Sequence, residues 1–256
     1  MTLEIANLRA GYGRKAVLQD VSVPHIQGGA FVGLIGPNAS GKSTLFKALA
    51  GLIKPMSGAI EISGQDVTHL SRRDRARRVA YMPQAFGCNA LLTVFESVLL
   101  ALKQTTGWRV RADNLDRVAD TLNALGLTHL ASRGIADLSG GQAQMVAVAQ
   151  TLVRAPEVIL LDEPTSALDL HHQLSIMTSI RNEMVRKKPV VMAALHDLNL
   201  AAKFCDRLVL LREGVILADG PPDEILSLPE IGETYRVLTN LERTSRGDLY
   251  VDARLA

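Results

Sequence analysis

The chain has 256 residues, of which 47% are hydrophobic and 21% are charged, which is typical of a globular protein with room for a sizeable core. Its 28 Lys and Arg against 26 Asp and Glu give a net charge of +2, which argues against a strongly basic nucleic-acid-binding protein and against an acidic disordered tail. No apolar run reaches the roughly 18 residues of a membrane-spanning helix, and the first residues lack the pattern of a secretory signal. We therefore expect a compact intracellular protein, with Cys88 and Cys205 as free thiols in a reducing cytosol.

In chain order, the first part of the sequence predicts short apolar strands around one helix. This helix covers Ser43–Leu52, where apolar residues recur at helical spacing after a glycine-rich turn. The arginine-rich run Arg72–Arg78 is expected to be a solvated helix face, with a contact to an acidic partner or to lipid headgroups as the alternative. The strands are expected at Leu3–Leu8, Ala16–Val23, Ala30–Ile35, Gly58–Ile62 and Val79–Met82.

The pattern changes from residue 85 to residue 138, where strand-like runs stop and helices are expected at Leu91–Leu102 and Asn114–Leu125. This segment is predicted to be a helical insertion within an α/β domain. Strands and helices alternate again after Ser139. The helices are expected at Gln142–Val153, Gln173–Arg186 and Leu198–Phe204, and the strands at Val158–Leu161, Val190–Leu195, Leu208–Leu211 and Val215–Ala218.

Continuously apolar strands separated by helices indicate a largely parallel sheet that is covered on both faces. The prediction is an α/β fold in a single domain spanning residues 1–256. Its core covers residues 1–84 and 139–220, the helical insertion covers 85–138, and a tail covers 221–256. Val237–Leu241 and Leu249–Ala253 are expected to form a β-hairpin in that tail.

The loop Gly36–Ser43 matches the phosphate-binding pattern G-x-x-x-x-G-K-[ST] and lies between a predicted strand and a predicted helix, as this pattern requires. Backbone N–H groups of such a loop surround phosphate oxygens, and the helix N-terminus adds a partial positive charge. Lys42 is expected to reach the β and γ phosphates, and Ser43 to bind Mg²⁺. By itself the loop indicates only a nucleoside triphosphate.

Two carboxylates, Asp162 and Glu163, follow the apolar strand Val158–Leu161. In a parallel sheet this strand end faces the same crevice as the phosphate loop. Asp162 could hold the metal through water, and Glu163 could orient or deprotonate a water that attacks the γ-phosphate. Acidic residues also end buried strands at ordinary turns, so the pair is informative because it accompanies the loop.

The segment Leu138–Gln142 has two readings. Ser139 is a good N-cap for the following helix, and a serine with two glycines at a helix N-terminus is also an anion-binding surface. With this segment the chain resembles, over nearly its whole length, the ATP-binding subunits of ABC transporters. Gly36–Ser43 is similar to their Walker A loop, Leu138–Gln142 to their signature motif, and Val158–Glu163 to their Walker B strand.

Four smaller motifs carry the same resemblance in the family's order. Ser166–Asp169 is similar to the D-loop, Gln84 to the Q-loop glutamine, His196 to the switch histidine, and Tyr12 to the aromatic residue that stacks on adenine. The resemblance implies a P-loop NTPase (RecA-like) core with a mainly parallel sheet, an antiparallel β subdomain and an inserted helical subdomain. It implies ATP and Mg²⁺ as ligands.

The resemblance also implies a role for each site residue. Glu163 is the implied general base, His196 steadies the γ-phosphate and the water, and Gln84 senses Mg²⁺. Metal contacts are implied for Ser43, Gln84 and Asp162. The implied ATP-binding residues are Tyr12, Gly36, Pro37, Asn38, Ala39, Ser40, Gly41, Lys42, Ser43 and Thr44.

Two copies are implied to pair head to tail, with each ATP between one copy's Walker A loop and the other copy's signature residues, and with Asp169 in communication between them. The signature residues are Ser139, Gly140, Gly141 and Gln142. Further implied partners are polytopic membrane permease subunits and, indirectly, a substrate-binding protein, but no nucleic acid. The implied location is peripheral, at the cytoplasmic face of the inner membrane.

Two departures from the family pattern are visible. Family members usually carry Gly where this chain has Ala39, and a backbone φ above zero there would cost of order 1 kcal/mol in strain. The helix after the signature usually carries arginines but here has Gln144, Met145 and Gln150. We expect ATP binding to survive the first departure, and Met145→Arg to alter ATPase rate or dimer stability.

Local runs favour the importer branch for iron–siderophore, haem and cobalamin uptake. These runs are Leu70–Gln84, Leu195–Ala202 and Asp219–Ile225. The implied function is therefore the ATP-hydrolysing motor subunit of such an importer, and the alternatives are a soluble ABC ATPase of an assembly machine or a subunit for another cargo. Phe86, Leu91 and Leu92 are candidates for the groove that receives the permease, with ordinary packing as the alternative.

Overall fold

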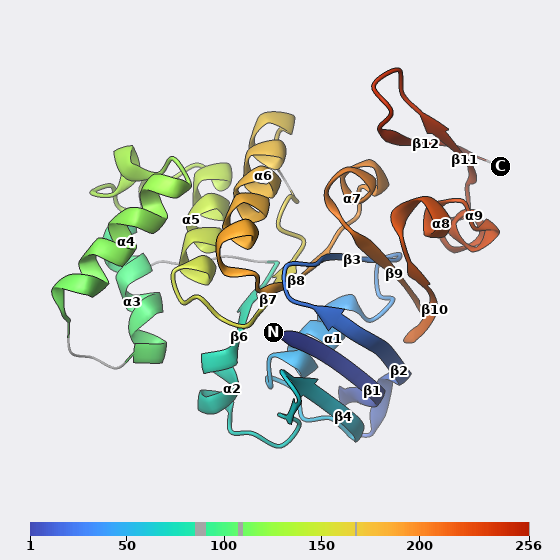
Figure 1. Ribbon diagram of the computed structural model, residues 1–256, viewed down its shortest axis with the longest axis horizontal. Coiled ribbons are helices and arrows are strands. Elements are labelled where there is room, and N and C mark those ends of the chain that lie inside the picture. The colour runs from blue at the N-terminus through green and yellow to red at the C-terminus, as the bar shows by residue number, and fades with distance from the viewer. Residues whose placement is uncertain (85–90, 107–109, 167, 256) are drawn as a thin grey trace.

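The computed structural model describes residues 1–84, 91–106, 110–166 and 168–255. Figure 1 shows a central sheet with a second sheet beside the N-terminus, a group of helices on one side and the C-terminal segment on the other. The strands of the central sheet are β3 (Phe31–Ile35), β6 (Val79–Met82), β7 (Val158–Asp162), β8 (Val190–Ala194), β9 (Arg207–Arg212) and β10 (Val215–Gly220).

The central sheet has the order β10-β9-β3-β8-β7-β6, and all its strands are parallel except β10, which pairs antiparallel with β9. Every residue of β3, β7 and β8 is buried, as the apolar runs predict for strands covered on both faces. Because neighbouring parallel strands end at the same edge, residues that follow β3, β6, β7 and β8 are brought together there.

The second sheet is antiparallel and has the order β2-β1-β4-β5. Its strands are β1 (Thr2–Tyr12), β2 (Lys15–Gln27), β4 (Ser57–Ile62) and β5 (Gln65–Asp66). The two long strands exceed their predicted lengths, and β5 is absent from the sequence prediction. Leu3, Ile5 and Leu8 of β1 are buried in one cluster with residues of helix α1 (Lys42–Leu49) and the central sheet.

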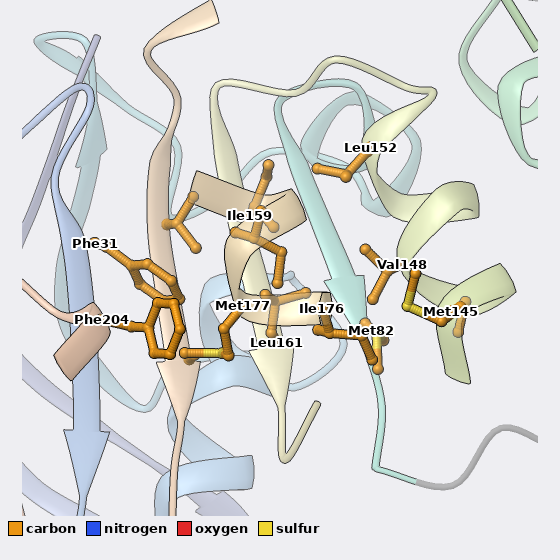
Figure 2. Close-up of a cluster of buried hydrophobic side chains, with 14 of the residues drawn as sticks. Phe31, Met82, Met145, Val148, Leu152, Ile159, Leu161, Ile176, Met177 and Phe204 are labelled. Carbon is orange, nitrogen blue, oxygen red and sulfur yellow. The ribbon is translucent and has the colours of Figure 1, made fainter. Parts of the chain in front are cut away.

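The central sheet separates two hydrophobic clusters. Along β7, Ile159 and Leu161 face one cluster, whereas Val158 and Leu160 face the other, which contains α1. Figure 2 shows the first cluster, in which Phe31 lies beside Phe204 while Met145 and Val148 lie close to Met82. Helices α5 (Gly140–Leu152), α6 (Leu170–Lys187) and α7 (Leu198–Phe204) therefore cover this face.

Helix α5 also packs against α3 (Val94–Thr106) and α4 (Ala112–Ala124), which lie at the left edge of the view in Figure 1. Short 3-10 turns at Thr128–Leu130 and Ile135–Asp137 lead from α4 to α5. In the part of the chain that the structure describes, no helix is long and apolar enough to cross a bilayer.

The C-terminal segment contains α8 (Pro222–Leu226), α9 (Pro229–Tyr235) and the antiparallel pair β11 (Leu238–Arg243) and β12 (Leu249–Arg254). The two short helices are absent from the sequence prediction, although each begins with a proline, which is a usual first residue of a helix. Ile231 and Val251 are buried in the same cluster as β7. The segment is thus packed onto the central sheet.

Helix α2 (Arg72–Arg78) corrects the expectation of a fully solvated arginine face, because Arg75 is only 1% exposed. Its guanidinium donates to the carbonyl of Leu49 at 2.9 Å and to that of Val67. Leu49 ends α1, so the buried cation satisfies a carbonyl that the helix leaves unpaired. Burial lowers the pKa of Arg75 to about 10.

Candidate nucleotide site

The loop between β3 and α1 has the backbone conformation of a tight phosphate cradle. Gly36, Ala39 and Gly41 have φ values of 147°, 62° and 113°. Two of these are glycines, which adopt such angles at little cost, whereas Ala39 carries the strain expected for a side chain at a positive φ. The sequence predicts a strain cost at Ala39 only if its backbone φ is positive, and the structure shows that it is.

Several hydrogen bonds hold this loop. The Lys42 ammonium donates to the carbonyls of Gly36 at 2.6 Å and Pro37 at 2.9 Å, and the N–H of Gly214 donates to the carbonyl of Ser40 at 2.9 Å. The N–H of Gly36 donates to the hydroxyl of Tyr235 at 2.8 Å. Burial lowers the pKa of Lys42, and the charges of Glu163 and Asp162 oppose this shift.

The loop lines a cavity of about 480 Å³. The lining residues are Val17, Asn38, Ala39, Ser40, Gly41, Lys42, Ser43, Thr44, Gln84 and Glu163. Val17 is the one that the sequence prediction missed. The buried Ser40 hydroxyl has no hydrogen-bond partner among the described residues, as expected of a group that a ligand would satisfy. Tyr12 is 52% exposed at the end of β1 and, like Gly36 and Pro37, is not among the lining residues.

Asp162 is 2% exposed and accepts hydrogen bonds on both carboxylate oxygens. The Ser43 hydroxyl donates to Oδ1 at 3.2 Å, and the Tyr81 hydroxyl donates to Oδ2 at 3.0 Å. Burial raises the pKa of Asp162, and these two hydrogen bonds oppose the shift. The sequence prediction did not assign Tyr81, whose contact with Asp162 depends on the pairing of β6 with β7 in the folded chain.

Gln84, Glu163 and His196 follow three neighbouring strands, β6, β7 and β8, and they meet. The Gln84 amide donates to Glu163 Oε2 at 2.6 Å, and His196 Nε2 lies 2.5 Å from Glu163 Oε1. Glu163 has a φ of 53°, an uncommon angle for a residue with a side chain. The structure thus places these residues beside the phosphate loop, with Glu163 held from both sides.

Ser139, Gly140, Gly141 and Gln142 lie at the N-terminus of α5 and are not among the residues that line the cavity. Ser139 caps the helix: its hydroxyl accepts from the N–H of Gln142 at 3.3 Å, while the Gln142 side chain accepts from the N–H of Ser139 at 3.1 Å. Asp169 likewise caps α6 and contacts His172 Nδ1 at 2.8 Å. Among the described residues, neither the four signature residues nor Asp169 line the cavity of their own chain.

Two of the departures after the signature, Gln144 and Met145, are buried, whereas nothing in the structure explains Gln150. Met145 is buried in the core, so Met145→Arg would test packing rather than an ion pair. The preceding Gln144 donates to the carbonyl of Pro164 at 3.0 Å, which ties α5 to the residue after Glu163.

The remaining predicted positions are the permease candidates, the cysteines and one residue of the segment Ser166–Asp169. Phe86, Cys88 and Ala167 lie outside the described residues, whereas Leu91 is fully exposed. Cys205 is a free cysteine, and burial raises the pKa of its thiol.

The residues at the cavity fit Mg²⁺. Ser43, Asp162 and Gln84 offer a hydroxyl, a carboxylate and an amide oxygen, the hard oxygen donors that this ion prefers. The described residues contain no cluster of three His, Cys, Asp or Glu able to hold a metal by themselves. Mg²⁺ in nucleotide sites is usually held by one or two carboxylates together with phosphate oxygens of the nucleotide. Asp162, as the one carboxylate of this donor set, fits that pattern.

Comparison with known proteins gives one consistent result. Residues 18–166 match the protein family described as ABC transporter. The ferric enterobactin transport ATP-binding protein FepC of Escherichia coli is 36% identical, over 92% of this chain and 89% of that protein. The hemin import ATP-binding protein HmuV of Nocardia farcinica is 38% identical, over 91% of this chain and 80% of that one.

Solved structures agree in fold. An inward-facing ABC transporter described as of the metal-chelate type superposes with a TM-score of 0.83 at 25% identity, over 99% of this chain and 97% of that one. A dimeric ATP-binding cassette in a post-hydrolysis state, bound to ADP and Pi, has a TM-score of 0.76 at 29% identity, over 86% of this chain and 98% of that one.

Proposed function

The chain belongs to the ABC transporter family, and from this premise we propose that it is the ATP-hydrolysing motor subunit of an importer for an iron–siderophore, haem or cobalamin complex. The observation that carries the ATPase assignment is the contact of Gln84 and His196 with Glu163 beside the phosphate loop. The cargo class rests on what the similar proteins are described as transporting, including the cobalamin import ATP-binding protein BtuD of Halobacterium salinarum, 37% identical over 89% of this chain and 57% of that one.

ATP would bind with its phosphates along the N–H groups of Asn38–Thr44 and with Tyr12 against the adenine. Lys42 would exchange its carbonyl partners in the loop for β- and γ-phosphate oxygens, a stronger, charge-assisted contact. The buried Ser40 hydroxyl would gain the partner it lacks. Both changes would stabilise the loop with a nucleoside triphosphate bound relative to the loop without one.

Ser43, Asp162 and Gln84 would hold Mg²⁺, which when bound neutralises charge on the phosphates. Tyr81 and Ser43 orient the Asp162 carboxylate from either side. Because Asp162 is buried, these hydrogen bonds favour its charged form in a setting that otherwise disfavours charge.

Glu163 would accept the proton of the attacking water as general base. His196 and Gln84 fix its two oxygens, so the carboxylate is oriented before ATP arrives. His196 would then steady the γ-phosphate and the water. Phosphoryl transfer depends mostly on such positioning and on charge stabilisation.

The nucleotide site would be completed by a second copy. Ser139, Gly140, Gly141 and Gln142 lie outside the cavity of their own chain, so they are free to meet ATP held by a partner arranged head to tail. Asp169 would lie at the same junction. A site that closes only when both copies and ATP are present would couple hydrolysis to opening of the dimer.

A permease would dock next to Gln84. A second cavity, of about 130 Å³, lies between β6, α3 and α5 and is lined by residues that include Pro83, Gln104 and Arg154. Movement of a permease helix here would reach Glu163 through Gln84. The chain would then work as a peripheral protein on the cytoplasmic face of the membrane, with a substrate-binding protein acting through the permease.

The test is reconstitution of the chain and its co-purifying permease in proteoliposomes, with ATPase measured against substrate-binding protein loaded with ferric siderophore, haem or cobalamin. We expect stimulation by one of these cargoes, and loss of hydrolysis with retained ATP binding in Glu163→Gln. The same change at exposed Glu233 is the control and should leave hydrolysis intact. Co-purification with ribosomes or a scaffold protein instead of a polytopic membrane protein would contradict the importer assignment, and an active Glu163→Gln would contradict the catalytic one.

A further inference from the structure

The C-terminal segment reaches the phosphate loop through one side chain. The hydroxyl of Tyr235, the last residue of α9, accepts the N–H of Gly36 at 2.8 Å across 199 residues of sequence. Burial raises the pKa of Tyr235 to about 12, so the group is a neutral hydroxyl at physiological pH. None of the roles assigned above to site residues includes Tyr235.

Gly36 is the joint at which β3 turns into the loop. A Cβ at this position would lie 2.0 Å from the carbonyl oxygen of Leu211, so the backbone is pressed against β9. The N–H of Gly36 is held by Tyr235, and its carbonyl is held by Lys42 at 2.6 Å. The peptide groups on either side of Gly36 therefore join the C-terminal segment to the lysine that is expected to contact the phosphates.

The segment that carries Tyr235 is itself firmly anchored. Ile231, one turn before Tyr235, is fully buried. The side chain of Asn199 in α7 accepts from the N–H of Val251 at 2.7 Å and donates to its carbonyl at 3.3 Å. Because α7 begins two residues after His196, the segment is attached beside both the phosphate loop and the histidine.

We propose that Tyr235 is a positioning residue for the nucleotide loop, which holds Gly36 in the conformation that binds ATP. The inference rests on the proposed nucleotide site. Without the hydroxyl, the N–H of Gly36 loses its partner and the loop populates other conformations. The apparent Kd for ATP then rises, because it equals the intrinsic Kd divided by the fraction of chains whose loop is competent to bind.

The test compares Tyr235→Phe with Tyr250→Phe, the same change at an exposed residue of the same segment. ATPase is measured in the permease complex with Mg²⁺-ATP as the probe. We expect KM to rise about 2- to 12-fold in Tyr235→Phe, the range for one lost hydrogen bond, with kcat unchanged within about 2-fold. Tyr250→Phe should match the wild type in both constants.

A Tyr235→Phe chain with a lowered melting temperature but an unchanged KM would assign Tyr235 to the fold alone and overturn the inference. Hydrogen exchange of the nucleotide-free wild type tests the same contact without any substitution. The Gly36 amide should exchange more slowly than those of Asn38 and Ala39, and equally fast exchange would overturn the proposal. A wild type that does not bind ATP would instead refute the proposed site itself, together with this inference.

Discussion

Single residues in the phosphate loop set its conformation at a measurable cost. Ala39 has a φ of 62° and Gly41 a φ of 113°. Gly41 has no Cβ and adopts its positive φ at little cost, whereas the Cβ of Ala39 makes its positive φ a strained conformation. Ala39 also lines the cavity. The strain persists because the neighbouring residues of the loop are fixed by Lys42, Gly214 and Tyr235.

Replacement of Ala39 by Gly should relieve this strain. We expect the free energy of unfolding to rise by about 1 kcal/mol or less, because the gain at a positive φ is partly offset by the greater freedom of Gly in the unfolded chain. Urea denaturation measures the effect. Ala155→Gly is the matched control, since Ala155 has a φ of 45° outside the cavity, and it should stabilise the chain without any change in ATP affinity. A less stable Ala39→Gly chain would contradict the strain.

At the scale of elements, strands β6 and β7 are connected by different contacts at their two ends. The carboxyl ends of β6 and β7 bring Gln84 and Glu163 into contact, while their amino ends are joined by an ion pair between Arg78 and Glu157. The guanidinium lies 2.6 Å from the carboxylate, and the N–H of Glu157 donates to the carbonyl of Arg78. This clamp fixes the register of β6 against β7 at the end opposite the site.

Glu157→Gln tests the clamp through pH. The hydrogen bond from Arg78 holds the pKa of Glu157 below its usual value of 4.5, so its ionised form stabilises the fold. That stabilisation is complete above the unfolded-state pKa and is lost as pH falls through the folded-state pKa. We expect the variant to be less stable than the wild type by about 1 kcal/mol near pH 7, with the difference shrinking below pH 4.5.

Urea denaturation of the wild type and of Glu157→Gln, near pH 7 and below pH 4.5, measures this difference in stability. The same substitution at Glu233, which is exposed and forms no ion pair within the described part of the chain, is the control. A Glu157→Gln deficit that stays constant from neutral to acidic pH would show that the ionised pair is not the source.

Local patterns were enough to predict the elements and motifs that depend on nearby residues. Local residue patterns predict three features of the site: the phosphate loop, the buried strand that leads to Asp162, and the cap formed by Ser139. The partners of Tyr81 and Tyr235 were not predicted, because they lie 81 and 199 residues away and meet only in the folded chain. Arg75 was misjudged for the same reason: its burial depends on the end of α1.

At the scale of the whole molecule, we propose that one chain carries half of the complete nucleotide site. The phosphate loop, Asp162 and Glu163 are assembled at one edge of the sheet, whereas the residues resembling the signature cap α5 away from that cavity. Both features follow if the functional unit is a head-to-tail pair of chains. Within the described part of the chain, no heavy atom outside the local helix backbone lies within 4 Å of where a Cβ on Gly140 would be, so this position is open on its own chain.

The mass of the Glu163→Gln chain with Mg²⁺-ATP, measured by sedimentation equilibrium, tests most directly whether two copies share the nucleotide. We predict 27.6 kDa without ATP and twice that mass with ATP, because the variant binds the nucleotide without turning it over. Adding Gly140→Arg, whose Cβ would meet no described atom within 4 Å outside the local helix backbone but whose long side chain would obstruct a partner, should keep the ATP-bound chain single. A Glu163→Gln chain that binds ATP and stays at the mass of one copy would contradict the shared site.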